Sequence, residues 1–261
     1  MDKKKLKSML VAIITLAFVL AIIYLFLTSN NIPGEVYSSM IIVLICSILF
    51  LIVFIKARNA NPLEKPKGIL LVAEIAVNKI ESMVVDNMGE KFRSFSGYMF
   101  AVVAFVFMSF TIGLLGLPSP MTYYMVPLSI ALCTFVLIHY TSIKHTRWGY
   151  FNRFLEPLPV FLPVNLLSMW APLISLSFRL FGNAISGWVL MTIAYEALKG
   201  LSDAIFGLPY FASPMVAPFL HAYFDIFSGY IQTLVFSSLT MMFILQEVPV
   251  IDATEDQVVS K

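Results

Sequence analysis

The sequence predicts an all-α, polytopic membrane protein with about six transmembrane helices. Of its 261 residues, 59% are hydrophobic and only 12% are charged, against about 25% charged residues in soluble globular proteins. Uncharged stretches long enough to cross a hydrocarbon core, which takes about 20 residues, recur along the chain. The composition therefore excludes an ordinary soluble domain. The net charge of only +2 also excludes a nucleic-acid binder, which would show lysines and arginines clustered on one face.

The first two spans are expected at Met9–Leu27 and Val36–Ile55. Lysines precede Met9–Leu27, a pattern that a signal peptide shares. The uncharged run is longer than the hydrophobic region of about 7–15 residues in a signal peptide, and no Ala-x-Ala site follows it. Residues 1–66 are therefore expected to form a two-helix membrane anchor region.

Gly68–Asn87 predicts one amphipathic helix between the second and third spans. Its apolar residues recur at the i, i+3, i+4, i+7 spacing, while Glu74, Lys79, Glu81 and Asp86 interrupt them. Such a helix lies along the membrane surface or against other helices rather than crossing the membrane.

A helical hairpin is expected over Ser94–Ile143, which contains no charged residue and is broken by Pro118-Ser119-Pro120. Proline sets a turn there because its ring removes a backbone donor and disfavours helix in the preceding residue.

A second, longer hairpin closes the chain. Pro157–Tyr195 and Ala204–Gln246 each carry a single charged residue and are too long for one upright span. Prolines in the second segment predict a helix start at about Phe219, which leaves about 42 Å of helix. Helices of this length must tilt steeply in a core about 30 Å thick or project from it.

The charge distribution orients this bundle. With the N-terminus inside and six crossings, the cytoplasmic segments collect the lysines and arginines, and the outer loops carry only Lys199. The positive-inside rule then places the N-terminus and the acidic C-terminal tail in the cytoplasm. A bacterial plasma membrane is the expected location of this multi-pass protein.

Sequence motifs for catalysis, cofactors and metals are absent. No Gly-x-Ser-x-Gly, His-Glu-x-x-His, Cys-x-x-Cys or phosphate-binding loop occurs. Cys46 and Cys133 sit inside apolar runs, which favours small buried hydrophobic residues over a disulfide or metal site. Neither a cofactor nor a metal is expected. A catalytic side chain without a motif would escape this search, so an intramembrane enzyme that uses His221 or His139 stays an alternative.

Arg179 is the most costly residue of the predicted spans. An arginine at the centre of a span costs about 2.5–3.5 kcal/mol on insertion scales. At 100° per residue, several polar side chains lie within about 40° of it, namely Asn165, Ser168, Ser175, Asn183 and Ser186. This stripe faces water, a partner helix or an ion path. The alternative is an arginine that snorkels to the interface or binds a carbonyl.

A second polar stripe is expected on the last helix. The same arithmetic groups His221, Asp225, Gly229 and Gln232. Asp225 is a candidate proton or cation relay, with a solvated interfacial carboxylate as the alternative, and His221 is either part of that path or a polar helix cap. Glu196 is a further candidate on the preceding helix. The two stripes facing each other would line one pathway.

Ser175-Leu-Ser-Phe-Arg179-Leu-Phe-Gly-Asn183 resembles the signature of the a subunit of F-type ATP synthases. Supporting motifs are Leu162-Pro-Val-Asn165-Leu, Ser142-Ile-Lys144, Gly116-Leu-Pro118 and Ile231-Gln232-Thr-Leu-Val-Phe236. The resemblance covers about Ile69 to Leu245 and implies that residues 67–261 form an ion-translocating core with a cytoplasmic tail.

The resemblance also implies roles. Arg179 matches the essential stator arginine that faces the carboxylates of the c-ring, Asn183 and Gln232 match its polar neighbours, and Asp225 matches a position of the last helix that is usually Glu or His. Ions, expected to be protons, would pass through two half-channels to and from the c-ring. The partners implied are the c-ring, the peripheral stalk b subunits, the other ATP synthase subunits and lipid. The chain itself would catalyse no chemistry.

Several positions depart from that family. Trp188 stands where an acid or His is usual, and Glu196, about two turns on, is a hypothetical replacement. Ser168 and Met169 replace acids on the expected exit path. The helix at Met9–Leu27 is additional, either an anchor or a contact with another stator subunit. H⁺ against Na⁺ stays open, and a self-contained secondary transporter or channel built on Arg179 and Asp225 is the alternative function, although no inverted repeat is found.

Overall fold

The computed structural model describes residues 33–60, 65–146, 160 and 162–247, with residues 13, 16, 17, 20 and 24 in isolation. Its regular elements are all helices, and five of them are long and apolar enough to cross a membrane. These five confirm the all-α fold and match the second to sixth predicted spans. The first predicted span, Met9–Leu27, and the tail after residue 247 lie outside the described residues apart from the isolated positions.

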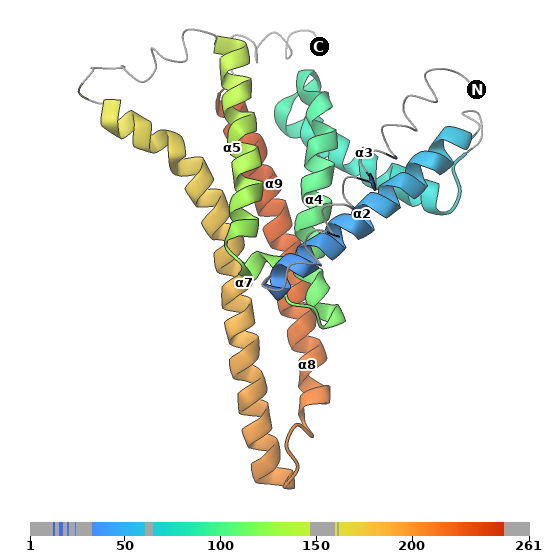
Figure 1. Cartoon of the computed structure of the whole chain (residues 1–261), viewed down its shortest axis with the longest axis vertical. Coiled ribbons are helices and arrows are strands. Elements are labelled where there is room, and N and C mark those ends of the chain that lie inside the picture. Colours follow the sequence, from blue (N-terminus) through green and yellow to red (C-terminus); the bar gives the residue numbers. More distant parts are fainter. Residues whose placement is uncertain are drawn as a thin grey trace.

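Five long helices and one amphipathic helix make up the bundle (Figure 1). In chain order the elements are α2 (Gly34–Asn59), α3 (Ile69–Met88), the 3₁₀ helix η1 (Glu90–Phe95), α4 (Ser96–Thr111), α5 (Met125–Thr146), α7 (Leu162–Phe206), α8 (Ser213–His221), the π-helical segment η6 (Ala222–Phe227) and α9 (Ser228–Gln246). Helix α7 runs beside α8 towards the turn that joins them, and α5 contacts both α7 and α9 beyond that region (Figure 1).

The hairpin predicted between α4 and α5 is confirmed. Two short 3₁₀ helices form its turn, η2 (Ile112–Leu115) and η3 (Pro120–Thr122). The Ser119 hydroxyl donates to the Ser109 carbonyl at 2.7 Å and accepts the Met121 N–H at 3.4 Å. Gly116 has φ 76°, a left-handed conformation that glycine adopts without steric cost. The turn thus provides hydrogen-bond partners for part of its own backbone.

Helix α3 confirms the predicted amphipathic helix. It is too charged to count among the candidate spans. Val84 and Met88 near its end are buried against η1, α4 and α9, whereas Val72 and Ile75 near its start are exposed. One half of α3 therefore belongs to the core of the chain, and its placement on the membrane surface stays a prediction.

The last long helix begins earlier than predicted. It is continuous from Ser213 to Gln246, 34 residues, although Pro218 lies inside it. The predicted start at about Phe219 was wrong because Pro214 occupies the first turn, where a missing N–H costs nothing. Membrane helices also tolerate an interior proline where nearby groups satisfy the freed carbonyl. Helix α7 likewise runs unbroken for 45 residues through Pro172, which is about 68 Å.

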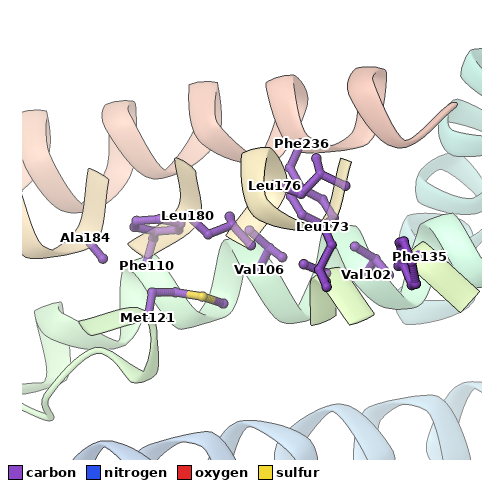
Figure 2. Close-up of a cluster of buried hydrophobic side chains, with 11 residues drawn as sticks. Val102, Val106, Phe110, Met121, Phe135, Leu173, Leu176, Leu180, Ala184 and Phe236 are labelled. Carbon is purple, nitrogen blue, oxygen red and sulfur yellow. The ribbon is translucent and has the colours of Figure 1, made fainter. Parts of the chain in front are cut away.

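The core lies where α4, α5, α7 and α9 meet (Figure 2). Leu176 and Leu180 of α7 are completely buried there, as is Phe236 of α9. A Cβ added to Gly229 would come 2.6 Å from the Cβ of Phe110, so α9 approaches α4 as closely as a glycine permits. These contacts fix the rotation of α7 and with it the direction of Arg179.

Both described cysteines are free thiols. Cys46 is half-buried, and its sulfur lies 3.5 Å from that of Met108. Cys133 is exposed, so the prediction that it is buried was wrong for the isolated chain.

Candidate functional site

Arg179 lies at the edge of the buried face of α7. Its neighbours Leu176 and Leu180 are buried, whereas Arg179 and Phe178 are exposed. Among the described residues Arg179 forms no ion pair. Exposed apolar side chains lie within about 120° of it around the helix, namely Val164, Leu167, Phe178, Val189 and Ile193. A single unpaired cation thus stands beside an apolar surface that no described element covers.

A cavity of about 290 Å³ lies beyond Arg179 towards the α7–α8 turn. We refer to it as the Asp225 cavity. Asn183 and Trp188 of α7 line it, together with His221 and Asp225 of the last long helix and Glu35 of α2. An indole thus stands at this wall on the α7 side, and the ionisable groups come from α8, η6 and α2.

A chain of three side chains connects α7 with the last helix at this cavity. The Tyr195 hydroxyl lies 2.8 Å from His221 Nε2, and His221 Nδ1 lies 2.6 Å from Asp225 Oδ2. The Asp225 side chain is only 18% exposed. It projects from the π-helical segment η6, and π-bulges frequently mark functional sites. Gly113 leaves room for the carboxylate, since a Cβ there would approach Asp225 Oδ2 to 3.1 Å.

The two predicted polar stripes do face each other. Asn183 Nδ2 donates to Gln232 Oε1 at 3.1 Å, and the Ser228 hydroxyl donates to Asn183 Oδ1 at 3.0 Å. Gln232 is buried, so this polar contact lies inside the bundle. It ties α7 to α9 one turn from Arg179.

A second cavity, of about 440 Å³, lies on the other side of Arg179. We refer to it as the Ser168 cavity. Three of the predicted site residues line it from α7, namely Asn165, Ser168 and Ser175. His139 of α5, Gln246 at the end of α9 and Glu247 just after it complete its polar lining.

Arg179 therefore separates two polar cavities along α7. Ser175 lines the Ser168 cavity and Asn183 lines the Asp225 cavity, and each is one helical turn, about 6 Å, from Arg179. Arg179 is not among the described residues that line either cavity. An ion that moved directly between the cavities would have to pass this charge.

Glu196, like Arg179 and Gln232, is not among the described residues that line these cavities. Its side chain is 67% exposed and lies 3.5 Å from Lys199 Nζ, an i, i+3 pair. It points from the exposed face of α7, and the lining of the Asp225 cavity does not include it. Its role in place of an acid at Trp188 stays a prediction without support from this geometry.

Sequence reasoning missed several residues at the site: Glu35, Tyr195, Ser228 and Glu247. It considered His139 only for an intramembrane enzyme. Tyr195 lies about 160° from Arg179 around the helix, so the stripe arithmetic excluded it. A usable signal was present, because Tyr195 and His221 flank the α7–α8 turn at comparable distances along the sequence. An antiparallel pair brings such positions together.

Within the described residues, no group of three or more His, Cys, Asp or Glu side chains is placed to hold a metal ion. The polar chemistry of the two cavities consists of hydroxyls, amides, carboxylates and imidazoles. These are groups that bind water and exchange protons.

Comparison with known proteins places this arrangement in a family. The sequence profile of the family described as ATP synthase A chain matches residues 36–245. The chain is 30% identical over 226 residues to the ATP synthase subunit a of Enterococcus hirae, covering 81% of this chain and 91% of that protein.

Two further relatives carry the same name. The ATP synthase subunit a of Mycoplasmoides gallisepticum is 27% identical over 227 residues, covering 80% of this chain and 76% of that protein. The Streptococcus agalactiae (serotype Ia) protein is 30% identical over 210 residues, covering 76% and 84%. The chain belongs to the ATP synthase A chain family, whose members are the non-catalytic, ion-translocating subunits a in the membrane sector of ATP synthases.

Proposed function

We propose that Arg179 is the stator charge that faces the carboxylates of a rotating c-ring, and that the two cavities are the two half-channels. The observation that carries this proposal is the position of Arg179. It is exposed on an apolar face of α7 and stands one turn from each cavity. A cation without a partner in lipid is costly, so a partner carboxylate on another chain is the natural complement.

The mechanism follows from the cost of charge in lipid. A carboxylate on the c-ring takes up an ion from the Asp225 cavity and becomes neutral, so it can rotate through hydrocarbon. When it returns to Arg179, the guanidinium favours the ionised carboxylate and lowers its pKa. The ion then leaves through the Ser168 cavity. The same positive charge repels cations that would pass directly between the cavities.

The positions of the lysines and arginines indicate which cavity opens to which side of the membrane. Lys56 and Arg58 end α2, and Lys144 lies near the end of α5 that carries His139 of the Ser168 cavity. By the positive-inside rule, this end faces the cytoplasm. The Asp225 cavity then opens to the outside of a bacterial plasma membrane, and both termini are cytoplasmic.

The partners follow from the surfaces. The exposed apolar face of α7 around Arg179 packs against the c-ring helices and the intervening lipid. We propose that residues 67–261 form the ion-translocating core and residues 1–66 a two-helix anchor region, and that the peripheral stalk b subunits are further partners. The ion is the proton.

ATP-driven pumping in vesicles that hold the assembled complex tests this function. Arg179→Ala is expected to abolish pumping while the complex still copurifies with its ring-forming subunit. Lys199→Ala is the matched control, because it removes another cation of α7 that is already paired with Glu196. Pumping by Arg179→Ala at the parent rate contradicts the proposal. Ion transport by the chain alone in vesicles would instead support the secondary transporter.

A further inference from the structure

We propose that Tyr195, His221 and Asp225 form a proton relay, in which His221 transfers the proton and Tyr195 is the positioning residue that sets its tautomer. The relay rests on the proposed function, since it delivers protons towards the c-ring from the Asp225 cavity. It goes beyond the family pattern, because Tyr195 and His221 are not positions that the resemblance assigned.

The two hydrogen bonds of the imidazole determine where its proton sits. A carboxylate oxygen accepts, so His221 Nδ1 carries the hydrogen in its 2.6 Å contact with Asp225 Oδ2. In neutral His221, Nε2 is then the acceptor of the Tyr195 hydroxyl at 2.8 Å. The hydrogen bond made by one ring nitrogen fixes the state of the other. Tyr195 thereby keeps Nε2 without a hydrogen of its own, on the side of the ring away from Asp225.

The relay moves one proton at a time from the cavity to the c-ring. A proton from water in the cavity binds Nε2 while the Tyr195 hydroxyl turns from donor to acceptor. The Nδ1 proton passes to Asp225 Oδ2, which leaves a neutral carboxylic acid and a neutral imidazole protonated at Nε2. Asp225 gives its proton to the c-ring carboxylate and becomes ionised again. The imidazole then returns to its Nδ1–H tautomer by exchange with water in the cavity, which takes the Nε2 proton and supplies one to Nδ1, so one proton enters and one leaves.

Two simpler accounts fit the structure less well. A polar cap is not needed at His221, because α8 continues without interruption into η6 and α9. A solvated interfacial carboxylate would be mostly exposed, but the Asp225 side chain is 18% exposed and the His221 side chain 30%. Both ring nitrogens of His221 contact side chains that exchange protons. The three side chains therefore form a continuous hydrogen-bonded chain rather than a solvent-exposed ion pair.

The relay makes this path specific for protons. A ring nitrogen that carries a hydrogen has no lone pair for a metal cation, whereas imidazole can take up a proton at one nitrogen and release one from the other. Glu35 is the other titratable group that lines the cavity in the described residues, and Trp188 offers none. Among the described residues, His221 is the titratable group hydrogen-bonded to Asp225. The proton therefore reaches Asp225 from the imidazole of His221.

Chemical rescue tests the relay. We expect His221→Ala to slow ATP-driven proton pumping at least about tenfold, a lower bound set below the roughly 10²–10⁴-fold that a positioned proton-transfer group contributes. Added imidazole should restore most of this rate by occupying the space left in the cavity, and it should leave Arg179→Ala inactive. Tyr195→Phe should slow pumping about threefold through loss of tautomer control. Tyr223→Phe is the matched control, since Tyr223 is exposed and contacts Phe224 and Phe227 instead of His221.

The outcomes separate the relay from the proposed function. Parent-rate pumping by His221→Ala, or an assembled His221→Ala complex that imidazole does not restore, overturns the relay. If Arg179→Ala is still inactive, the proposed function survives that result. A pumping rate that requires Na⁺ also overturns the relay. Should His221→Ala fail to assemble, the near-isosteric Tyr195→Phe decides, because pumping equal to that of Tyr223→Phe would show that the hydroxyl has no part in transfer.

Discussion

The two cavities on either side of Arg179 differ in their chemistry. The Asp225 cavity holds a half-buried carboxylate and an imidazole in one hydrogen-bonded chain. The Ser168 cavity is larger, about 440 Å³ against about 290 Å³, and α7 contributes only an amide and hydroxyls to it. Its ionisable groups, His139 and Glu247, come from other segments.

This difference matches two different tasks under the proposed function. On the Asp225 side, a proton must be delivered to a carboxylate, which needs groups that take and give protons. On the Ser168 side, Arg179 itself favours the ionised carboxylate, so a polar lining that holds water is sufficient. Under the proposed function, the Ser168 side therefore needs no acid on α7.

The largest expected effect comes from removing the carboxylate of Asp225. Asp225→Asn keeps the shape of the side chain but cannot carry a proton, so we expect pumping to fall at least about tenfold. Glu247→Gln, the matched change in the Ser168 cavity, should leave the rate within about twofold because Arg179 still drives release. Proton pumping by the reconstituted complex measures both. Equal losses would show that the two cavities do not differ in function.

The next effect concerns the wall of the Asp225 cavity. Gly229→Ala places a methyl group 2.6 Å from the Cβ of Phe110, and Phe110 lines this cavity but not the other. Overpacking of this kind costs about 1–3 kcal/mol. Thermal unfolding in detergent should show a lower midpoint, and pumping should fall with it.

Gly97→Ala controls for the substitution itself, since a Cβ at Gly97 meets no atom within 4 Å. An unchanged melting midpoint for Gly229→Ala would mean that α4 and α9 can separate without cost. The wall of the Asp225 cavity would then be mobile, and this cavity would not be the smaller and better-defined of the two.

Much of the fold could be predicted from the sequence because lipid imposes a simple rule on length and charge. The uncharged runs matched five of the described helices, and the i, i+3, i+4 spacing identified α3. The start of α8 could not be predicted from its prolines alone. Pro214 and Pro218 were treated as helix breakers, whereas their cost depends on which carbonyls nearby groups satisfy.

The site was predicted where helical geometry is regular and missed where it is not. Asn183 and Gln232 meet as the two stripes required. Tyr195 was missed because it contacts His221 across the hairpin from the opposite side of α7 to Arg179. The π-helical segment η6 shifts the residues after Asp225 from the 100° rule. No single-helix pattern contains such contacts between helices.

A smaller effect is expected at the contact between the stripes. Asn183 binds both Ser228 and Gln232, and hydrogen bonds between membrane helices contribute about 0.6 kcal/mol each on average. A double-mutant cycle of Asn183→Ala and Ser228→Ala should give a coupling of about that size in the free energy of unfolding. A coupling of zero would mean that the 3.0 Å contact does not hold α7 against α9.

The smallest effect should come from the Ser168 cavity. The Ser168 hydroxyl donates to the Val164 carbonyl of its own helix at 2.9 Å, so it holds no neighbouring element. Ser168→Ala removes one polar group among several in an open cavity of about 440 Å³. We expect a pumping rate within about twofold of the parent, because bridging water replaces a lost hydroxyl at little cost. Ser168→Leu narrows the same space and excludes that water, so its rate should fall further. If Ser168→Ala alone slowed pumping as strongly as Asp225→Asn, the Ser168 cavity would need a specific proton carrier as well, and Arg179 would not be sufficient for release.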